Sequence, residues 1–211
     1  MNNLRKFATE ADYSAATLNY PAVSWVVSGD TVHFDKAGAT VNNKVKLAFT
    51  TDVCGAGKSF SVVPDGAMFD ILDGLIINGV PYAGDDCSFA IDLEANTNYL
   101  IEYELKSDVT DVSGLFNIDA TEGCSSNEHY KYDILFPAQV TNISSLHEEE
   151  AINSILFESA TPPTLYIASS STAFNVYAPA ASISAYESAF ASQTEVNVYT
   201  LSQYNGNIPL N

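Results

Sequence analysis

Apolar and polar residues alternate along much of the stretch from residue 41 to residue 106. A period of two is typical of strands that bury one face. The runs at 87–93 and 99–105 are separated by four turn-forming residues, which predicts an antiparallel hairpin with one apolar face. Asn78-Gly79 predicts a further tight turn. Several short alternating strands predict an immunoglobulin-like β-sandwich over residues 36–108.

The first 35 residues follow a different pattern. A capping-box variant predicts a helix of about two turns over Thr9–Ala16. Two β-rich runs, at 22–27 and 31–35, flank a tight-turn composition and predict a hairpin. We therefore expect residues 1–35 to form a small N-terminal helix-hairpin module.

Residues 109–211 carry short apolar runs, each followed by polar turn residues. The runs at 134–136 and 155–157 are about 20 residues apart, which is typical of a repeat. A short amphipathic helix is predicted at 180–191, and a final strand at 196–201 precedes a polar tail. The predicted fold is thus mainly β, with a short repeat-like β/α cap. Since one repeat cannot bury its own apolar face, the cap must pack on the sandwich or on another subunit.

The net charge of −18, from 26 acidic and 8 basic residues, narrows the choice of partners. No Lys or Arg follows Lys131, so the C-terminal part is purely acidic. Nucleic acid and anionic lipid would be repelled, whereas a basic protein surface, a cation or a neutral ligand would not. The N-terminus lacks the apolar stretch of a signal peptide, and no apolar run is long enough to span a membrane. We expect synthesis in a cytoplasm and no membrane insertion.

Three cysteines, Cys54, Cys87 and Cys124, are an odd number and lack the paired short spacings of a disulfide framework or a zinc site. Unpaired cysteines behave as small hydrophobic residues and are usually buried. The sequence therefore predicts reduced, mostly buried thiols.

The sequence shows no constellation that supports catalysis or cofactor binding. Gly55–Ser59 resembles the end of a phosphate-binding P-loop, but Asp52 stands where that motif requires glycine. The segment is more simply a glycine turn between strands. No orienting partner accompanies His33, His129 or His147, which predicts surface histidines. We expect no catalytic residue, no metal site and no cofactor, and hence a protein that is not an enzyme.

Five segments carry a resemblance to a known family: Ile77–Val80, Tyr103–Lys106, Phe136–Ile143, Ile155–Leu165 and Val176–Tyr186. Together they resemble a degenerate BspA-like leucine-rich repeat protein of Bacteroidetes and their phages, and the last repeat and cap match best. In that family a β-sandwich leads into repeats that read roughly Phe/Ile-Pro-x-x-Val-Thr-x-Ile. The resemblance covers about residues 75–200, and it implies a degenerate repeat region because hardly any true repeats precede the last one.

The opening segments Arg5–Tyr13 and Asn19–Val26 resemble the N-terminal parts of virion proteins from crAss-like gut bacteriophages. This resemblance implies a virion structural protein: a capsid auxiliary or decoration protein, or a head-fibre or tail-fibre component. Its expected location is the virion, after synthesis in the host bacterial cytoplasm. Its expected partners are other capsid or tail proteins, in a homo-oligomer or a large assembly. The alternative is an adhesion module that binds a host-surface glycan.

The N-terminal module would dock the protein on its particle, because so short a segment cannot bury all of its large apolar side chains. An equally open alternative is that these side chains pack on the first sheet of the sandwich. The candidate docking residues are Leu4, Phe7, Tyr13, Tyr20 and Trp25.

Overall fold

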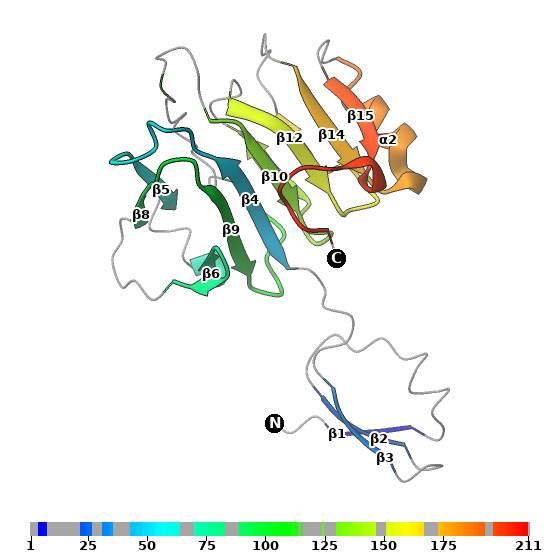
Figure 1. Cartoon of the computed structure of the whole chain (residues 1–211). Coiled ribbons are helices and arrows are strands. Elements are labelled where there is room, and N and C mark those ends of the chain that lie inside the picture. The colour runs from blue at the N-terminus through cyan, green and yellow to red at the C-terminus, as the bar shows by residue number, and fades with distance from the viewer. Residues whose placement is uncertain are drawn as a thin grey trace. The chain divides into compact units, whose positions relative to one another are not determined.

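The computed structural model describes residues 4–7, 22–26, 31–35, 43–63, 70–82, 89–113, 115, 124, 130–146, 151–166, 173–192 and 196–210. The chain divides into two compact units, Met1–Asn42 and Asn43–Asn211. The described residues are mainly β, with one large mixed sheet and a single short α-helix (Figure 1). Within these residues, no helix has the length and apolar character needed to cross a membrane.

The first unit contains a three-stranded sheet of β1 (Leu4–Phe7), β2 (Ala22–Val26) and β3 (Thr31–Asp35). Strands β2 and β3 pair antiparallel, as the sequence predicted for this hairpin. Strand β1 pairs parallel with β2, and the sequence pattern did not predict it. The helix predicted over Thr9–Ala16 lies outside the described residues.

An eight-stranded mixed sheet forms the frame of the second unit, in the order β15-β14-β12-β10-β4-β9-β6-β7. Its first half along the chain is antiparallel, and its second half is a parallel ladder. The strands are β4 (Lys44–Thr50), β6 (Leu72–Ile77), β7 (Val80–Pro81), β9 (Asn98–Leu105), β10 (Tyr132–Phe136), β12 (Ile152–Phe157), β14 (Phe174–Ala178) and β15 (Val196–Thr200).

The antiparallel half follows directly from the alternating sequence. In β9 the residues Tyr99, Ile101, Tyr103 and Leu105 are buried, and the residues between them are partly exposed. The turn from β6 to β7 is Asn78-Gly79, with φ of 50° and 79°, as the sequence predicted. Positive φ at both central residues matches the twist of paired strands and favours Asn-Gly.

The predicted hairpin between the runs at 87–93 and 99–105 is wrong. Strand β8 (Phe89–Asp92) pairs with β5 (Ser59–Val63), whereas β9 pairs with β4 and β6. At the start of the connection from β8 to β9, the amide of Leu93 donates a hydrogen bond to the carbonyl of Lys58, at 2.8 Å. Crossing from one layer to the other lets both apolar faces bury against the same core, which a flat hairpin would not allow.

Four parallel strands confirm the repeat-like spacing. Strands β10, β12, β14 and β15 begin at Tyr132, Ile152, Phe174 and Val196, which gives steps of 20, 22 and 22 residues. A second parallel ladder joins β11 (Asn142–Ser145) to β13 (Thr164–Tyr166).

The repeat region packs on the antiparallel half through β10, which pairs antiparallel with β4. Ile134 lies opposite Leu47 in this pairing. Of the two packing partners expected for the cap, the sandwich region or another subunit, the structure shows the first. One sheet runs across the boundary expected between residues 108 and 109, and the compact unit begins at Asn43.

The two faces of the large sheet are covered differently. The main core lies on one face, where the 3-10 turn Ala180–Ser182 and helix α2 (Ile183–Ala189) confirm the predicted helix. Tyr186 of α2 is fully buried and its ring centroid is 5.2 Å from that of Phe157. A smaller cluster on the other face includes Ile208, so the C-terminal segment that follows β15 covers part of that face (Figure 1).

Candidate functional site

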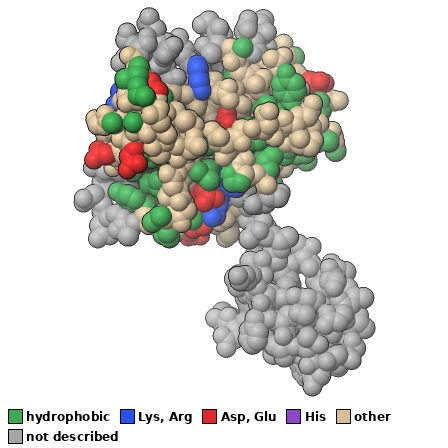
Figure 2. Space-filling model, in the orientation of Figure 1, with side chains coloured by type: hydrophobic (Ala, Val, Ile, Leu, Met, Phe, Trp, Pro, Cys, Tyr) green, Lys and Arg blue, Asp and Glu red, His purple; other side chains and the backbone are tan. Residues whose placement is uncertain are grey.

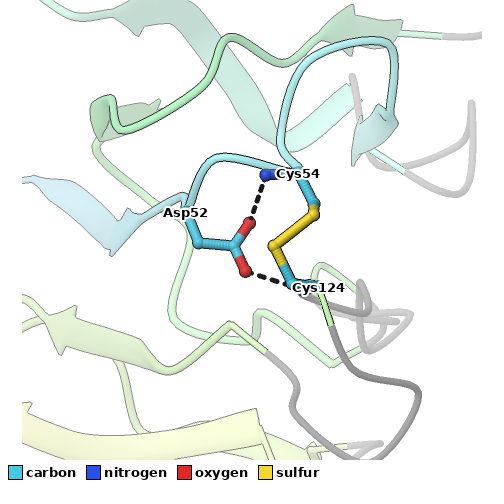
Figure 3. Close-up of side chains that lie close together, drawn as sticks. All are labelled: Asp52, Cys54 and Cys124. Atoms are coloured by element: carbon cyan, nitrogen blue, oxygen red, sulfur yellow. Dashed lines mark hydrogen bonds between the residues drawn. A yellow bond between two sulfur atoms is a disulfide. The ribbon is translucent and has the colours of Figure 1, made fainter.

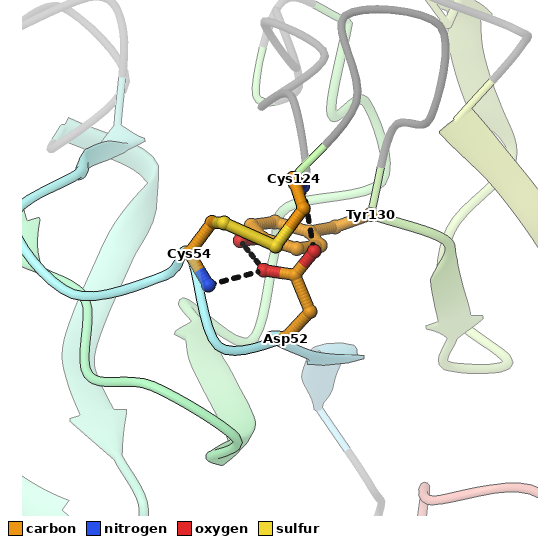
Figure 4. Close-up of a disulfide and its surroundings, with 4 residues drawn as sticks. All are labelled: Asp52, Cys54, Cys124 and Tyr130. Atoms are coloured by element: carbon orange, nitrogen blue, oxygen red, sulfur yellow. Dashed lines mark hydrogen bonds between the residues drawn. A yellow bond between two sulfur atoms is a disulfide. The ribbon is translucent and has the colours of Figure 1, made fainter.

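A disulfide joins Cys54 to Cys124, with the Cα atoms 5.1 Å apart (Figure 4). The prediction of reduced cysteines is therefore wrong for this pair, while Cys87 lies outside the described residues. Cys54 follows the end of β4, and Cys124 precedes the start of β10. Because β4 and β10 are antiparallel neighbours, the end of β4 lies beside the start of β10. The fold thus brings together two cysteines whose sequence separation of 70 gave no sign of pairing.

The carboxylate of Asp52 lies beside this disulfide and accepts three hydrogen bonds (Figures 3 and 4). The amide of Cys54 donates to Oδ1 at 2.9 Å, and the amide of Cys124 donates to Oδ2 at 2.7 Å. The hydroxyl of Tyr130 donates to Oδ1 at 2.8 Å. One carboxylate therefore ties both cysteine backbones to the residue that precedes β10 by two positions. The covalent bond joins two of these three segments, at Cys54 and Cys124.

Electrostatics at this junction favour the ionised carboxylate. Burial acts to raise the pKa of Asp52, but the three hydrogen bonds and the charge of Lys58 outweigh it and lower the pKa. Burial and the neighbouring Asp52 carboxylate raise the pKa of Tyr130 to about 12, so its hydroxyl remains a donor at neutral pH. The ammonium of Lys58 lies 5.7 Å from the centroid of the Tyr130 ring, which adds a cation–π contact.

The ligand atoms of Asp52, Cys54 and Cys124 lie within 4.8 Å of one another, a spacing that could suit a metal ion. Cysteine binds a metal as the thiolate, however, and both sulfurs are bonded to each other in the disulfide. Both carboxylate oxygens already accept hydrogen bonds. The arrangement suits a structural lock rather than a metal centre.

Substituting Tyr130→Phe is expected to raise the pKa of Asp52 toward its ordinary value. A carboxyl whose folded pKa is depressed stabilises the fold fully above its unfolded pKa and loses that contribution as pH falls through the folded value. The variant should therefore lose stability at a higher pH than the parent protein during acid titration. Carbon-detected NMR of the Asp52 carboxyl measures the pKa directly. Tyr82→Phe, at a more exposed tyrosine, is the control, and an unchanged Asp52 pKa in Tyr130→Phe would contradict the prediction.

A second carboxylate, that of the buried Asp133 in β10, holds the C-terminal segment to the face of the sheet that carries the smaller apolar cluster. The hydroxyl of Tyr204 donates to Asp133 Oδ2 at 2.6 Å, and the side-chain amide of Asn153 donates to Oδ1 at 2.7 Å. The Tyr204 hydroxyl also accepts the amide of Ile208 at 3.1 Å. Burial, and then the Asp133 hydrogen bond, raise the pKa of Tyr204. Nearby, the buried Lys46 donates to the carbonyl of Pro209 at 3.0 Å.

Gly206 permits this close approach. A Cβ at this position would lie 2.3 Å from the Tyr204 hydroxyl oxygen and 2.4 Å from Asp133 Oδ2. Gly206→Ala is therefore expected to displace the segment and to cost about 1–3 kcal/mol in the free energy of unfolding, as overpacking usually does. Chemical denaturation measures this loss. Asn205→Ala, at the exposed neighbouring position, should change stability little, and an equal effect of the two substitutions would rule out the steric explanation.

The structure places the five predicted docking residues only in part. Leu4 and Phe7 lie in β1 and Trp25 lies in β2, while Tyr13 and Tyr20 lie outside the described residues. Sequence reasoning did not select the two carboxylates Asp52 and Asp133 or their tyrosine partners. Asp52 could have been noticed as an Asx turn, because it stands two residues before Cys54 and its side chain accepts that amide.

The visible surface of the second unit carries hydrophobic side chains in separate groups among polar ones (Figure 2). Five large apolar residues of the described chain are exposed: Val53, Val80, Tyr82, Tyr199 and Leu210. No family model, curated protein or solved structure matches this chain.

Proposed function

We propose that this protein is a structural or attachment component of a bacteriophage particle that acts by packing against other proteins and not by catalysis. The observation that carries the proposal is the disulfide between Cys54 and Cys124. Disulfides persist on virion and cell surfaces and in other oxidising surroundings, and they are rare in a reducing cytoplasm. A particle protein made in the bacterial cytoplasm would acquire this bond after lysis releases it.

The two units would have separate roles. The first unit, Met1–Asn42, would dock through Leu4, Phe7, Tyr13, Tyr20 and Trp25, and its compactness supports a separate module. The second unit would project from the particle. In this unit the β5–β8 ladder shares a core with β4 and β9, and the ring centroid of Phe60 lies 5.0 Å from that of Phe49. This two-layered arrangement is compatible with the immunoglobulin-like sandwich that the sequence predicts, and the 20–22 residue parallel ladder supports a degenerate BspA-like cap.

The charge of the chain indicates which particle proteins it would contact. With a net charge of −18, the protein would bind basic or neutral surfaces of capsid or tail proteins, and not nucleic acid. A position as capsid decoration protein, head fibre or tail fibre agrees equally well with this charge. Copy number separates these positions, because a decoration protein is present in far more copies than a fibre.

Mass spectrometry of purified phage particles tests the proposal. We expect peptides of this chain in the particles, and non-reducing digestion should recover the Cys54–Cys124 cross-linked peptide. A chain that lacks residues 1–42 should keep the fold of the second unit and fail to join particles. Absence of the full chain from particles would refute the virion role, and incorporation of the truncated chain would refute docking by the first unit.

A second candidate, binding of a host-surface glycan, is favoured by one cluster of aromatic rings. The ring of Tyr177 lies 5.6 Å from that of Tyr199 and 5.2 Å from that of Tyr204, and Tyr199 is exposed. Exposed aromatic rings can stack on sugars, but they also suit protein interfaces, where tyrosine is enriched. A glycan array with the parent protein and Tyr199→Ala separates these readings: binding that the substitution abolishes would favour the glycan.

A further inference from the structure

The two edges of the large sheet differ in how well they are protected from pairing with another chain. Strand β7 forms one edge, has only two residues and contains Pro81. Short edge strands and proline are two of the ways in which proteins prevent edge-to-edge association. Strand β15 forms the other edge and has five residues, Val-Asn-Val-Tyr-Thr, with no proline and no charge. In the described part of the chain, no strand pairs with its outer side.

The parallel ladder ends at β15, whose apolar side chains are less buried than those of the strand beside it. Val196 and Val198 are only partly buried. Their register partners in β14, Phe174 and Val176, are 3% and 0% exposed. Solenoids need a terminal cap with a polar outer face, because each repeat relies on its neighbours to bury its apolar side. A further strand beside β15 would bury the parts of Val196 and Val198 that remain exposed.

Charge identifies a second copy of this chain as a suitable occupant. Residues 196–211 contain no charged side chain, although the whole chain has 26 acidic residues and a net charge of −18. Two copies would repel each other across most surfaces. At β15 they would not, because this strand brings no like charges face to face.

We propose that two copies of the protein associate through β15, which pairs antiparallel with β15 of the second copy about a two-fold axis at Val198. This pairing places Val198 opposite Val198 of the other copy and Asn197 opposite its Tyr199. The partly exposed Val198 would be covered, and two eight-stranded sheets would join into one. An isologous, self-complementary contact of this kind closes with two chains and does not propagate into fibres. The inference does not depend on the particle role proposed above.

The register of the proposed pairing allows a charge-swap test with the full chain. Sedimentation equilibrium of the parent protein should give twice the mass of one chain at high micromolar concentration. Asn197→Glu with Tyr199→Glu places glutamate opposite glutamate and should yield monomers. Asn197→Lys with Tyr199→Glu places opposite charges across the axis and should restore the dimer. Both positions are exposed, so neither double variant should unfold the chain.

Val80→Glu, which adds an acid to the exposed tip at the opposite edge, is the matched control and should leave the dimer intact. Val198→Cys supplies an independent measurement, since directly opposed residues of antiparallel strands are 4.5–5.5 Å apart at Cα, within disulfide range. We expect a cross-linked dimer on oxidation. A monomeric parent protein would overturn the proposal, as would a dimer that survives the double glutamate variant.

Discussion

Replacing Cys54 and Cys124 by serine is expected to lower the free energy of unfolding by about 4 kcal/mol, the loop-closure value for a cross-link that spans about 70 residues. Because 1 kcal/mol shifts the melting temperature of a chain of this size by about 2–4 °C, the expected decrease is about 8–16 °C. Thermal unfolding followed by circular dichroism measures it. The loss arises mainly from the greater freedom of the unfolded chain, so the folded β-sheet content should remain unchanged below the transition.

Two controls make this result specific. Cys87→Ser removes a thiol that does not take part in the Cys54–Cys124 bond, and it should not reproduce the loss. A reducing agent should destabilise the parent protein to the level of the double variant and leave the double variant itself unchanged. Equal melting temperatures for the parent and the double variant would show that the bond contributes little to stability.

Phe157→Ala is expected to cost about 3–5 kcal/mol, the usual range for removing a large aromatic side chain from a core. Phe157 is 1% exposed, and its ring centroid lies 5.8 Å from that of Phe136, 5.2 Å from Tyr186 and 6.4 Å from Phe190. It therefore joins two adjacent parallel strands to α2. Urea denaturation measures the loss. The slope of the unfolding free energy against urea concentration should stay unchanged, which would show that the variant still unfolds in two states.

The matched control removes an aromatic ring where it is much less buried. Tyr82 is 37% exposed, and Tyr82→Ala should cost far less than Phe157→Ala. Tyr186→Phe offers a finer comparison, because it keeps the ring and removes only the hydroxyl that donates to the carbonyl of Ser159 at 2.9 Å. We expect a loss of about 1 kcal/mol for that hydrogen bond. Similar losses for all three variants would contradict a core centred on Phe157.

Strand positions were predictable from sequence, whereas strand partners were less so. The alternation in β9 and the positive-φ turn at Asn78-Gly79 are local properties, and a period of two indicates them without knowledge of the fold. The partner of β8 depends on whether the chain turns back within one sheet or crosses to another layer. That choice depends on hydrogen bonds between distant residues, such as the one that the amide of Asn96 donates to the carbonyl of Asp52.

The candidate site was largely invisible in the sequence for a similar reason. Cys54 and Cys124 meet because β4 and β10 are neighbours, and an odd count of cysteines with wide spacing cannot reveal that. Asp133 and Tyr204 are 71 residues apart. The tail after β15 was expected to be merely polar, yet Leu201, Tyr204 and Ile208 all pack on the sheet. Their spacing at i, i+3 and i+7 was the one signal of an apolar side.

The C-terminal segment covers part of strand β4, and the length of chain between them determines how long β4 stays uncovered during synthesis. The Lys46 ammonium donates a hydrogen bond to the carbonyl of Pro209, and the Asn207 side-chain amide donates one to the hydroxyl of Thr50, across separations of 163 and 157 residues. At the usual translation rate of 5–20 residues per second, β4 leaves the ribosome about 8–30 s before the segment that covers it. During this time Ile208 cannot cover Ala48 and the rest of the smaller apolar cluster. A nascent chain halted before residue 201 would thus offer an apolar sheet face to chaperones.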